Sequence, residues 1–566
     1  MPALRSEIRP GAYYDSVVLM QLQRGLLTLP GVLDAGAIMA TPVNLELLEA
    51  SGLRPSEAPS SDDLLIVVRA ETDGAAGEAL AQVDALLARR RASIDAEFRP
   101  KSLAAATQQL PEAAWVLVSV PGRFAAGVAG DAVRLGKNVF LYSDNVPLED
   151  EVELKRQAAA RGLLVMGPDC GTAIIGGVGF GFANRVRPGS IGLVAASGTG
   201  LQAVTSAIHS LGGGISQAIG TGGRDLHAEV GGLTALQALD VLRRDPSTEV
   251  IVVISKPPAP EVAGRLVGAA RRMGKPVVFD LIGEPSFGGR LGNLHFAADL
   301  EDAAEIAVRL SASGSSSSSS PSPSAPPSHT RYFRALFSGG TLAYESVLAL
   351  QYVLAPLATN VPLRPDQRLN DPLHSRGHTI LDLGADAFTV GRLHPMIDND
   401  LRLRRLRQEA ADPDTAVILL DVVLGEGAHA DPASELAPAI SEALGRTSLT
   451  VVVVLVGTEQ DPQGLDSQRE RLLASGALVF SGLRQALAAV VERLPAGETA
   501  WPSPVPLESF ASPAAINVGL ETFFDSLVAQ GAAALHVDWR PPAGGDERLM
   551  GILAKMKTSG KANQAR

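Results

Sequence analysis

Short apolar runs alternate with helical segments along most of the chain. Runs such as Trp115–Val120, Ile191–Ala195 and Ala416–Val423 are rich in branched residues and short enough for strands buried on both faces. Segments with apolar positions at helical spacing lie between them. This alternation predicts an α/β fold in which helices cover parallel sheets.

The first 105 residues show the same alternation in shorter elements. Helices and strands are predicted in turn over residues 14–29, 34–40, 44–51, 63–70 and 77–91. This alternation of short helices and strands within so few residues favours a small ferredoxin-like α+β domain. Its residues suggest no chemistry of their own, so packing, oligomerisation or regulation are its expected roles.

Several segments recur in the same order on both sides of a Ser/Pro-rich stretch at 311–328. The strand 191–195 meets Ser-Gly-Thr-Gly, and the strand 334–337 meets Ser-Gly-Gly-Thr. The IGTGGRD segment is paralleled by LGAD, and the strand before Lys256 by the strand from Ala416. An ordered recurrence of this kind indicates two related α/β domains joined by a flexible tether.

Composition narrows the class of protein. At 566 residues the chain is too long for one core, and a net charge of −12 argues against a broad surface for nucleic acid or anionic membranes. Its single cysteine excludes intramolecular disulfides and multi-cysteine metal sites, so no metal is predicted. We find no uninterrupted apolar stretch long enough to span a membrane and no signal peptide, and we expect a cytoplasmic protein.

The loop after the Ala416–Val423 strand places a histidine among small residues. Gly425-Glu426-Gly427-Ala428-His429 follows the strand, and Pro432 allows a helix to begin. In α/β sheets, ligands bind at the carboxyl ends of the strands, where this loop is expected. His429 could be a group that is modified and moved, or it could cap a turn.

Other candidate residues fit an anionic ligand. Ser, Thr and Gly at strand-to-helix junctions leave N–H groups free at a positive helix end, although they also cap helices without a ligand. Arginine could clamp a carboxylate or phosphate, and the GRLHP segment could equally be a buried turn. Cys170 is interpreted as a buried thiol. The candidate binding residues are Ser197, Gly198, Thr199, Gly222, Arg224, Ser338, Gly340 and Thr341, and the candidate catalytic residues are Arg392, His394 and His429.

Five longer motifs together resemble the FdrA family, relatives of the succinyl-CoA synthetase α subunit, over nearly the whole chain. They are MGPDCGTAI, GSIGLVAASGTGLQAVTSAIHSLGGGISQAIGTGGRDL, LDLGADAFTVGRLHPMID, ILLDVVLGEGAHADP and GTEQDPQ. The last segment, from INVGL to HVDWRPPAGGD, is similar to the start of a companion protein family.

The resemblance implies a CoA-binding-like Rossmann domain and two flavodoxin-like ligase domains. In the synthetase a histidine on a mobile loop is phosphorylated between two helix N-termini, which makes His429 the implied relay. The synthetase's CoA-gripping Gly loop and a nucleotide-binding ATP-grasp domain are missing from this sequence. The expected organisation is a small domain at 1–105, the Rossmann domain at 106–188, ligase-like domains at 189–310 and 331–498, a linker at 311–330 and a docking segment at 499–566.

Three functions follow from this resemblance. The first is a subunit of an oxamate carbamoyltransferase of allantoin and purine catabolism, which would use carbamoyl phosphate or phosphate as substrate and no CoA. The second is a subunit of an NDP-forming acyl-CoA synthetase, with CoA and a nucleotide bound with the help of a partner. The third is a non-catalytic scaffold. Each implies companion subunits in an oligomer, and the first two imply a small anionic substrate.

Overall fold

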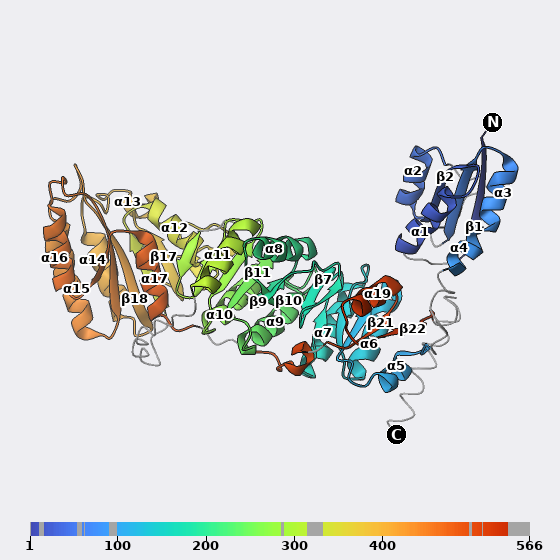
Figure 1. The fold of residues 1–566 in the computed structure, drawn as a ribbon. Helices are drawn as coiled ribbons and strands as arrows, with labels where there is room; N and C mark the ends of the chain where they lie inside the picture. Colours follow the sequence, from blue (N-terminus) through green and yellow to red (C-terminus); the bar gives the residue numbers. More distant parts are fainter. Residues whose placement is uncertain are drawn as a thin grey trace, which may run out of the picture. The chain divides into compact units, whose positions relative to one another are not determined.

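The computed structural model describes residues 2–10, 16–53, 59–60, 63–89, 99–284, 288–313, 332–496, 501–511 and 513–541. Most of the predicted linker, the Pro/Gly loop beyond Pro541 and the C-terminal end lie outside these residues. The chain forms two compact units, residues 1–105 with 536–566 and residues 106–535. Figure 1 shows the fold of each.

The first unit has a three-stranded antiparallel sheet in the order β1-β3-β2. The predicted strand at 63–70 is its centre, because Leu64 to Val68 are all fully buried. The sequence gives little sign of β1, since this edge strand carries charged residues; Arg5 and Arg9 pair with acids of α3 and α4. The elements are β1 (Ala3–Arg9), α1 (Ser16–Leu27), β2 (Val32–Met39), α2 (Pro42–Ala50), β3 (Leu64–Ala70), α3 (Asp73–Ala81) and α4 (Val83–Arg89).

A five-stranded sheet combines strands from residues 115–166 with strands from residues 515–537, most of which belong to the second unit. Its order is β22-β21-β4-β5-β6, and β21 pairs with β4 in parallel. The Trp115 indole N–H donates to the Ser509 carbonyl at 2.7 Å, which fixes the C-terminal segment against β4. The elements are α5 (Leu103–Gln109), β4 (Trp115–Val118), α6 (Gly122–Arg134), β5 (Asn138–Leu141), α7 (Leu148–Ala160), β6 (Val165–Met166), α18 (Glu508–Ala511), β21 (Ala515–Val518), α19 (Glu521–Ala529) and β22 (Ala534–Val537).

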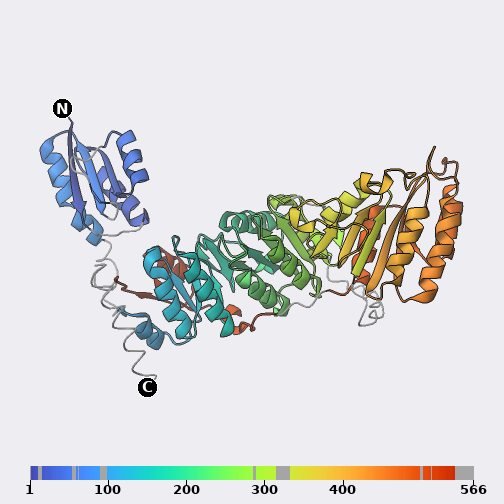
Figure 2. The ribbon, with the colours of Figure 1, turned by 180° about the vertical axis from the view of Figure 1, so that it is seen from behind.

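The next sheet has eight strands in the order β13-β14-β12-β11-β9-β10-β7-β8. Helices α8 and α11 cover one face, and α9 and α10 cover the other (Figure 1; Figure 2 from behind). Its elements are β7 (Thr172–Ile175), β8 (Val178–Gly181), β9 (Pro188–Ala195), α8 (Gly198–Ser210), β10 (Ile215–Gly220), α9 (Leu233–Arg244), β11 (Val250–Ser255), α10 (Pro260–Arg271), β12 (Val277–Leu281), β13 (Gly289–Leu291), β14 (Leu294–Phe296) and α11 (Leu300–Ala312).

The third sheet of this unit has six parallel strands in the order β16-β17-β15-β18-β19-β20. Helices α14 to α16 cover one face, and α12 and α17 cover the other. The elements are β15 (Tyr332–Phe337), α12 (Gly340–Leu350), β16 (Leu357–Thr359), β17 (His378–Asp382), α13 (Asp386–Thr389), α14 (Asp400–Ala411), β18 (Thr415–Val423), α15 (Pro432–Arg446), β19 (Thr450–Val456), α16 (Leu465–Ala474), β20 (Leu478–Phe480) and α17 (Leu483–Arg493), with a short 3-10 helix at Pro365–Gln367.

The two larger sheets repeat one topology, as the recurring motifs predict. The order β12-β11-β9-β10 in the eight-stranded sheet corresponds to β19-β18-β15-β17 in the six-stranded sheet. In each copy the helix after the first strand, α8 or α12, begins at the carboxyl edge of the sheet. This shared strand order confirms the predicted internal duplication.

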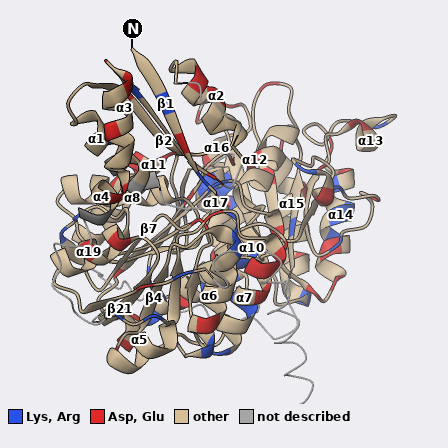
Figure 3. Cartoon of the chain, turned by 90° about the vertical axis from the view of Figure 1, so that its right-hand side faces the viewer, with Lys and Arg blue, Asp and Glu red and all other residues tan. Residues whose placement is uncertain are grey.

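Figure 3 shows acidic and basic residues interspersed on helices such as α7 and α14.

The two copies pack through the face that carries α10 in one and α17 in the other. Arg271 of α10 is partly buried and donates to the carbonyl groups of Val353, Val491 and Leu494. Burial, together with the positive charge of Arg272, lowers the pKa of Arg271 to about 10. Because its hydrogen bonds end on backbone carbonyls, Arg271 acts as a structural link between the copies.

Candidate functional site

Ser338, just before α12, is tied to the neighbouring strand β18. Its backbone N–H and its hydroxyl donate to the Asp421 carboxylate at 2.8 and 2.6 Å. Asp421 is fully buried and also accepts from Arg402 of α14 at 3.0 Å. Since both donors of Ser338 are used in this way, Gly340 and Thr341 supply the N–H groups that remain for a ligand at this helix start.

Asp382, at the end of β17, lies beside the same helix start. A Cβ atom placed on Gly340 would lie 3.1 Å from its Oδ2 atom, and its Oδ1 atom accepts the Gly384 N–H at 2.8 Å. Burial raises the pKa of Asp382, and the Gly384 N–H and His394 partly oppose that shift. The positive end of α12 is thus already close to two carboxyl groups, those of Asp382 and Asp421.

His394 faces this cluster from the segment after α13. Its Nδ1 atom accepts the Met396 N–H at 3.2 Å, and its Nε2 atom lies 2.8 Å from the position of a Cβ on Gly384. When the ring is neutral, this bond assigns the proton to Nε2. The Nε2–H group is then a hydrogen-bond donor directed at the turn next to Asp382.

His429 lies near His394 but points elsewhere. Its backbone N–H donates to the Met396 carbonyl at 2.8 Å. Its Nδ1 atom accepts the Asp431 N–H at 3.1 Å, and its Nε2 atom lies 3.3 Å from the Glu435 carboxylate of α15. The side chain is 21% exposed. The imidazole is therefore paired with α15 and not directed at the α12 start.

The loop that carries His429 is fixed at several points. Gln463 accepts the Gly425 N–H and donates to the carbonyl groups of Gly425 and His429. The Asp431 carboxylate accepts hydrogen bonds from Arg471 and Gln468, and these bonds lower its pKa. The flexible carrier loop predicted from its glycines is thus held in place by side chains of the 463–471 region.

The start of α8 forms a second group of candidate residues. Ser197 caps the helix, because its hydroxyl accepts the Gly200 N–H at 3.1 Å. Gly198 and Thr199 occupy the first turn, where N–H groups have no partner within the helix. The Thr172 hydroxyl is buried without a hydrogen-bond partner and lies 3.9 Å from the position of a Cβ on Gly198. A free hydroxyl next to free N–H groups is a donor set for an oxyanion.

Gly222 and Arg224 hold neighbouring loops together. Gly222 has a φ of 85°, and a Cβ there would lie 2.3 Å from the Pro168 carbonyl oxygen. Arg224 donates to the Val146 carbonyl at 2.8 Å and pairs with buried Glu151 at 2.9 Å. The close backbone approach explains the glycine. Arg224 is half-exposed, and these contacts make it a support for the 143–147 loop.

The structure thus brings the candidate residues together as two groups. Ser338, Gly340, Thr341, His394 and His429 lie at the carboxyl edge of the six-stranded sheet. The other group, at the edge of the eight-stranded sheet, contains Ser197, Gly198, Thr199, Gly222 and Arg224. No hydrogen bond or ion pair among the described residues joins the groups, so one anion shared by both helix starts stays a prediction.

The remaining candidates lie apart or are buried. Arg392 is exposed, and so is Lys256, which directly follows β11. Cys170 is 2% exposed, and burial raises the pKa of its thiol to about 12, so almost no thiolate is present near neutral pH. The interpretation of Cys170 as a buried thiol agrees with this environment.

Sequence reasoning missed the residues that orient these side chains. Asp421 is the one acid in an otherwise apolar strand, and that exception was the available signal. Arg402 belongs to an arginine-rich helix that looks solvated, and Thr172 lies in a hairpin that the apolar pattern does not reveal. Glu435 comes from a surface-like segment and gave no signal, whereas Gln463 is the last residue of the GTEQDPQ motif, to which no role was assigned.

Models of three known families match the chain. The AllF heavy metal-associated domain matches residues 1–101, the CoA binding domain matches 186–281, and the CoA-ligase model matches 336–492. The CoA binding match falls on the segment expected to form the first ligase-like domain. The prediction of an α/β fold with CoA-binding-like and ligase-like domains and a small N-terminal domain is confirmed.

The Escherichia coli (strain K12) protein YahF is 40% identical over 491 residues, which cover 84% of this chain and 95% of YahF. The chain belongs to the YahF family. This YahF family member is also similar to CoA ligase subunits. The α subunit 2 of an ADP-forming succinate–CoA ligase from Archaeoglobus fulgidus is 28% identical over 29% of the chain. SauD, an ADP-forming sulfoacetate–CoA ligase subunit from Bilophila wadsworthia, is 26% identical over 25% of the chain.

The chain spans about half the length of these ligase subunits, 56% of the first and 49% of the second. The relation to the succinyl-CoA synthetase α subunit is therefore confirmed at the level of the family, and the FdrA assignment stays a prediction. Among the described residues, no helix is long and apolar enough to cross a membrane.

The residues of the N-terminal domain do not fit a heavy metal. Residues 1–101 contain no cysteine and no histidine, the side chains that supply thiolate and imidazole ligands to transition metals. In the described part of the chain, no three His, Cys, Asp or Glu side chains are grouped closely enough to hold a metal ion. Packing, oligomerisation or regulation remain the predicted roles of this YahF-family domain.

Proposed function

We propose that this chain is the acyl-handling subunit of an NDP-forming acyl-CoA ligase-type enzyme. It would pass an acyl group between an acyl phosphate and the thiol of CoA, while a companion subunit binds the nucleotide. The carrying observation is the donor set at the α8 start, where N–H groups of Gly198 and Thr199 lie beside the unpartnered Thr172 hydroxyl. Gly198 and Thr199 lie within the segment that matches the CoA binding domain, residues 186–281, and Thr172 precedes it.

The chemistry follows from this donor set. When a thiol attacks the acyl carbon of an acyl phosphate, the bond to the phosphate oxygen breaks and phosphate leaves with an added negative charge. Fixed N–H and O–H donors stabilise that charge as it develops. A base must accept the thiol proton, and we assign this role to His394 of the other candidate group, whose Nδ1 atom would exchange the Met396 N–H for the thiol at the α8 start.

The test uses the half-reaction that needs no nucleotide. The purified chain, with and without its companion subunit, is incubated with acetyl or succinyl phosphate and CoA. Formation of a thioester and release of phosphate support the proposal. A complex that forms no thioester from any acyl phosphate and CoA would contradict it.

Thr172→Val tests the carrying observation. Valine keeps the shape but removes the hydroxyl that stabilises the developing phosphate charge, so kcat for thioester formation should fall roughly tenfold while KM changes little. The folded protein should lose no stability, because the hydroxyl has no partner to lose. Thr205→Val is the matched control in α8, since that hydroxyl donates within its own helix to Leu201. Equal kcat values for the two variants would remove Thr172 from the site.

Replacing the two histidines separates their roles. His394→Ala should lower kcat roughly 100-fold, because it removes the proposed proton acceptor. His429→Ala should have as large an effect only if His429 relays phosphate, as the resemblance implies; if it merely ties the loop to Glu435, the loss should be a few-fold. Labelling with acyl [32P]phosphate, followed by acid and base stability of the label, detects phosphohistidine directly. Unchanged turnover in His394→Ala would rule out its proposed role.

Carbamoyl transfer between carbamoyl phosphate and oxamate, the function first expected from the sequence, is the second candidate. One observation favours it. A Cβ on Gly122 would meet the backbone carbonyl groups of Asp144 and Asn145, so this loop packs against the start of α6 and would compete there with a CoA phosphate. The same preparation should be assayed with carbamoyl phosphate and oxamate. Formation of oxalurate without CoA would favour this candidate over thioester formation.

A further inference from the structure

A cavity lies at the end of β12, beside the start of α11. It has a volume of about 560 Å³ and is lined by Asp280, Glu284, Asp299, Glu301 and neighbouring backbone. Asp280 is only 4% exposed, and its Oδ2 atom has no hydrogen-bond partner. A buried carboxylate oxygen without a donor is costly, and proteins usually satisfy it. A ligand that brings donors would remove that cost.

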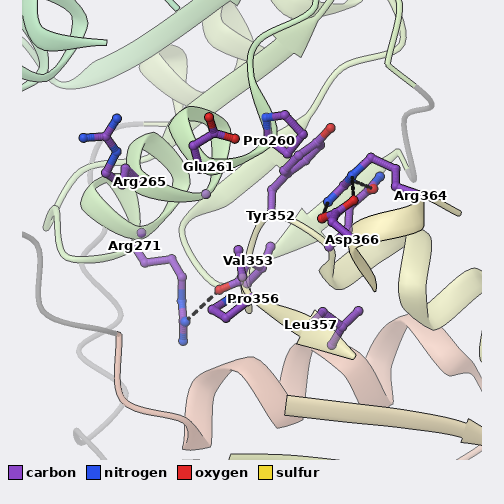
Figure 4. Close-up of a pocket in the computed structure, with 14 residues that line it drawn as sticks. Pro260, Glu261, Arg265, Arg271, Tyr352, Val353, Pro356, Leu357, Arg364 and Asp366 are labelled. Carbon is purple, nitrogen blue, oxygen red and sulfur yellow. Dashed lines mark hydrogen bonds and ion pairs between the residues drawn. The ribbon is translucent and has the colours of Figure 1, made fainter. Parts of the chain in front are cut away.

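The interface cavity between the two copies provides a contrast (Figure 4). It has a volume of about 350 Å³. There Arg364 lies over the Tyr352 ring and pairs with Asp366. The Tyr352 hydroxyl donates to Glu284 at 2.6 Å, and Arg271 donates to backbone carbonyls. These polar groups are already partnered, whereas Asp280 is not, so the Asp280 cavity is the stronger candidate for a ligand.

We propose that the Asp280 cavity binds a small organic cation, a primary ammonium or guanidinium compound, with Asp280 as its anchor. The four acidic side chains of the lining would repel a phosphate or carboxylate. A metal ion fits less well, because the described residues contain no group of three metal-binding side chains. An ammonium or guanidinium group supplies both the missing charge and directed N–H donors. The cavity volume suits a small molecule.

The neighbouring acids make proton competition part of this proposal. The titratable groups around Asp280 are Asp299 and Asp302 at the α11 start, together with Glu284 and Glu301. Burial and the charges of Asp299 and Asp302 raise the pKa of Asp280 to about 6. Asp280 is therefore mostly ionised near pH 7.5 and mostly protonated near pH 5. Cation binding should weaken as the pH falls through about 6.

The site is independent of the proposed ligase function. It lies two strands away from the α8 start, since Ala195 pairs with Ile254 and Ile254 with Asp280. Glu284 contributes to the cavity and also accepts the Tyr352 hydroxyl, so an occupant would contact a residue of the interface between the copies. The cation could therefore be part of a substrate or a separate effector.

The test measures binding of agmatine, putrescine and guanidinium to the full chain by calorimetry. We expect saturable binding of at least one of them and a tenfold or greater loss of affinity in Asp280→Asn. Glu305→Gln removes the same charge from an exposed position of α11 outside the cavity lining and should bind normally. Circular dichroism checks that Asp280→Asn is folded, as expected when an unpartnered carboxylate becomes neutral.

Each other outcome overturns the proposal. Equal affinities of Asp280→Asn and Glu305→Gln would place the cation elsewhere. Binding of Mg²⁺ but of no organic cation would make the cavity a metal site, and no binding of any probe would leave it without a ligand. Binding that is the same at about pH 5 and about pH 7.5 would exclude Asp280 as the anchor. None of these results depends on thioester formation, so the two proposals can fail separately.

Discussion

Replacing Lys155 by Met is expected to lower the free energy of unfolding by roughly 3–5 kcal/mol. Lys155 is 2% exposed, and its ammonium group donates to Glu151 at 2.9 Å, to Asp225 at 2.8 Å and to the Thr221 carbonyl at 3.1 Å. Methionine fills similar space but leaves two fully buried carboxylates without this cation. The change should appear as an earlier transition in urea-induced unfolding followed by circular dichroism.

Arg156→Met is the matched control, because it removes one positive charge from the next position of α7, where the side chain is exposed. We expect it to change stability by no more than about 0.5 kcal/mol. Adding Glu151→Gln to Lys155→Met should recover part of the loss, since one unpaired charge is then neutral. If Lys155→Met unfolds at the same urea concentration as Arg156→Met, the buried network contributes little to stability.

The Lys155 network also shows a kind of burial that cannot be predicted from the sequence. An acidic helix start followed by a lysine, as in α7, normally predicts a solvated face. Burial comes instead from the 221–225 loop of the next domain, which contacts α7 over a separation of 70 residues between Lys155 and Asp225. A tertiary contact of this kind leaves no periodic pattern in either segment.

The parallel strands could be predicted because their signal lies within each segment of the sequence. A strand buried on both faces must be apolar throughout, so β11 (VIVVIS) and β19 (TVVVVLV) stand out in the sequence. The Ser-Gly motifs then mark where helices begin, and their recurrence predicts the duplicated topology. The pairing of β21 with β4 was missed because it joins segments far apart in the sequence, whereas the β7–β8 hairpin carried a signal that was overlooked, the Gly176-Gly177 turn.

The histidines show the same limit within the site. Their glycine-rich or proline-containing loops at a strand end correctly place His394 and His429 at one sheet edge. The direction of each ring depends on backbone N–H groups and on side chains that look like ordinary surface residues in the sequence. Met396 orients His394, and Asp431 and Glu435 orient His429. Sequence reasoning therefore located the candidate groups but not their hydrogen-bonding roles.

Replacing Asp421 by Asn is expected to destabilise the protein by roughly 3–5 kcal/mol and to disturb the α12 start. The carboxylate accepts the Ser338 N–H, the Ser338 hydroxyl and Arg402, and all three residues are nearly or fully buried. An amide can replace only one acceptor oxygen, and it leaves the Arg402 guanidinium without a counter-charge. Burial lowers the pKa of Arg402. Asp421 opposes that shift, because its negative charge stabilises the buried guanidinium.

Two further variants decide whether charge or shape is responsible. Asp400→Asn breaks an exposed pair with Arg404 on α14, whose side chains are 57% and 71% exposed, and should cost no more than about 0.5 kcal/mol. Arg402→Met added to Asp421→Asn removes the stranded buried charge and should restore part of the stability. If the double variant is no more stable than Asp421→Asn, the loss arises from the Ser338 bonds, and the helix start depends on that turn alone. If Asp421→Asn unfolds like Asp400→Asn, Asp421 does not anchor the α12 start.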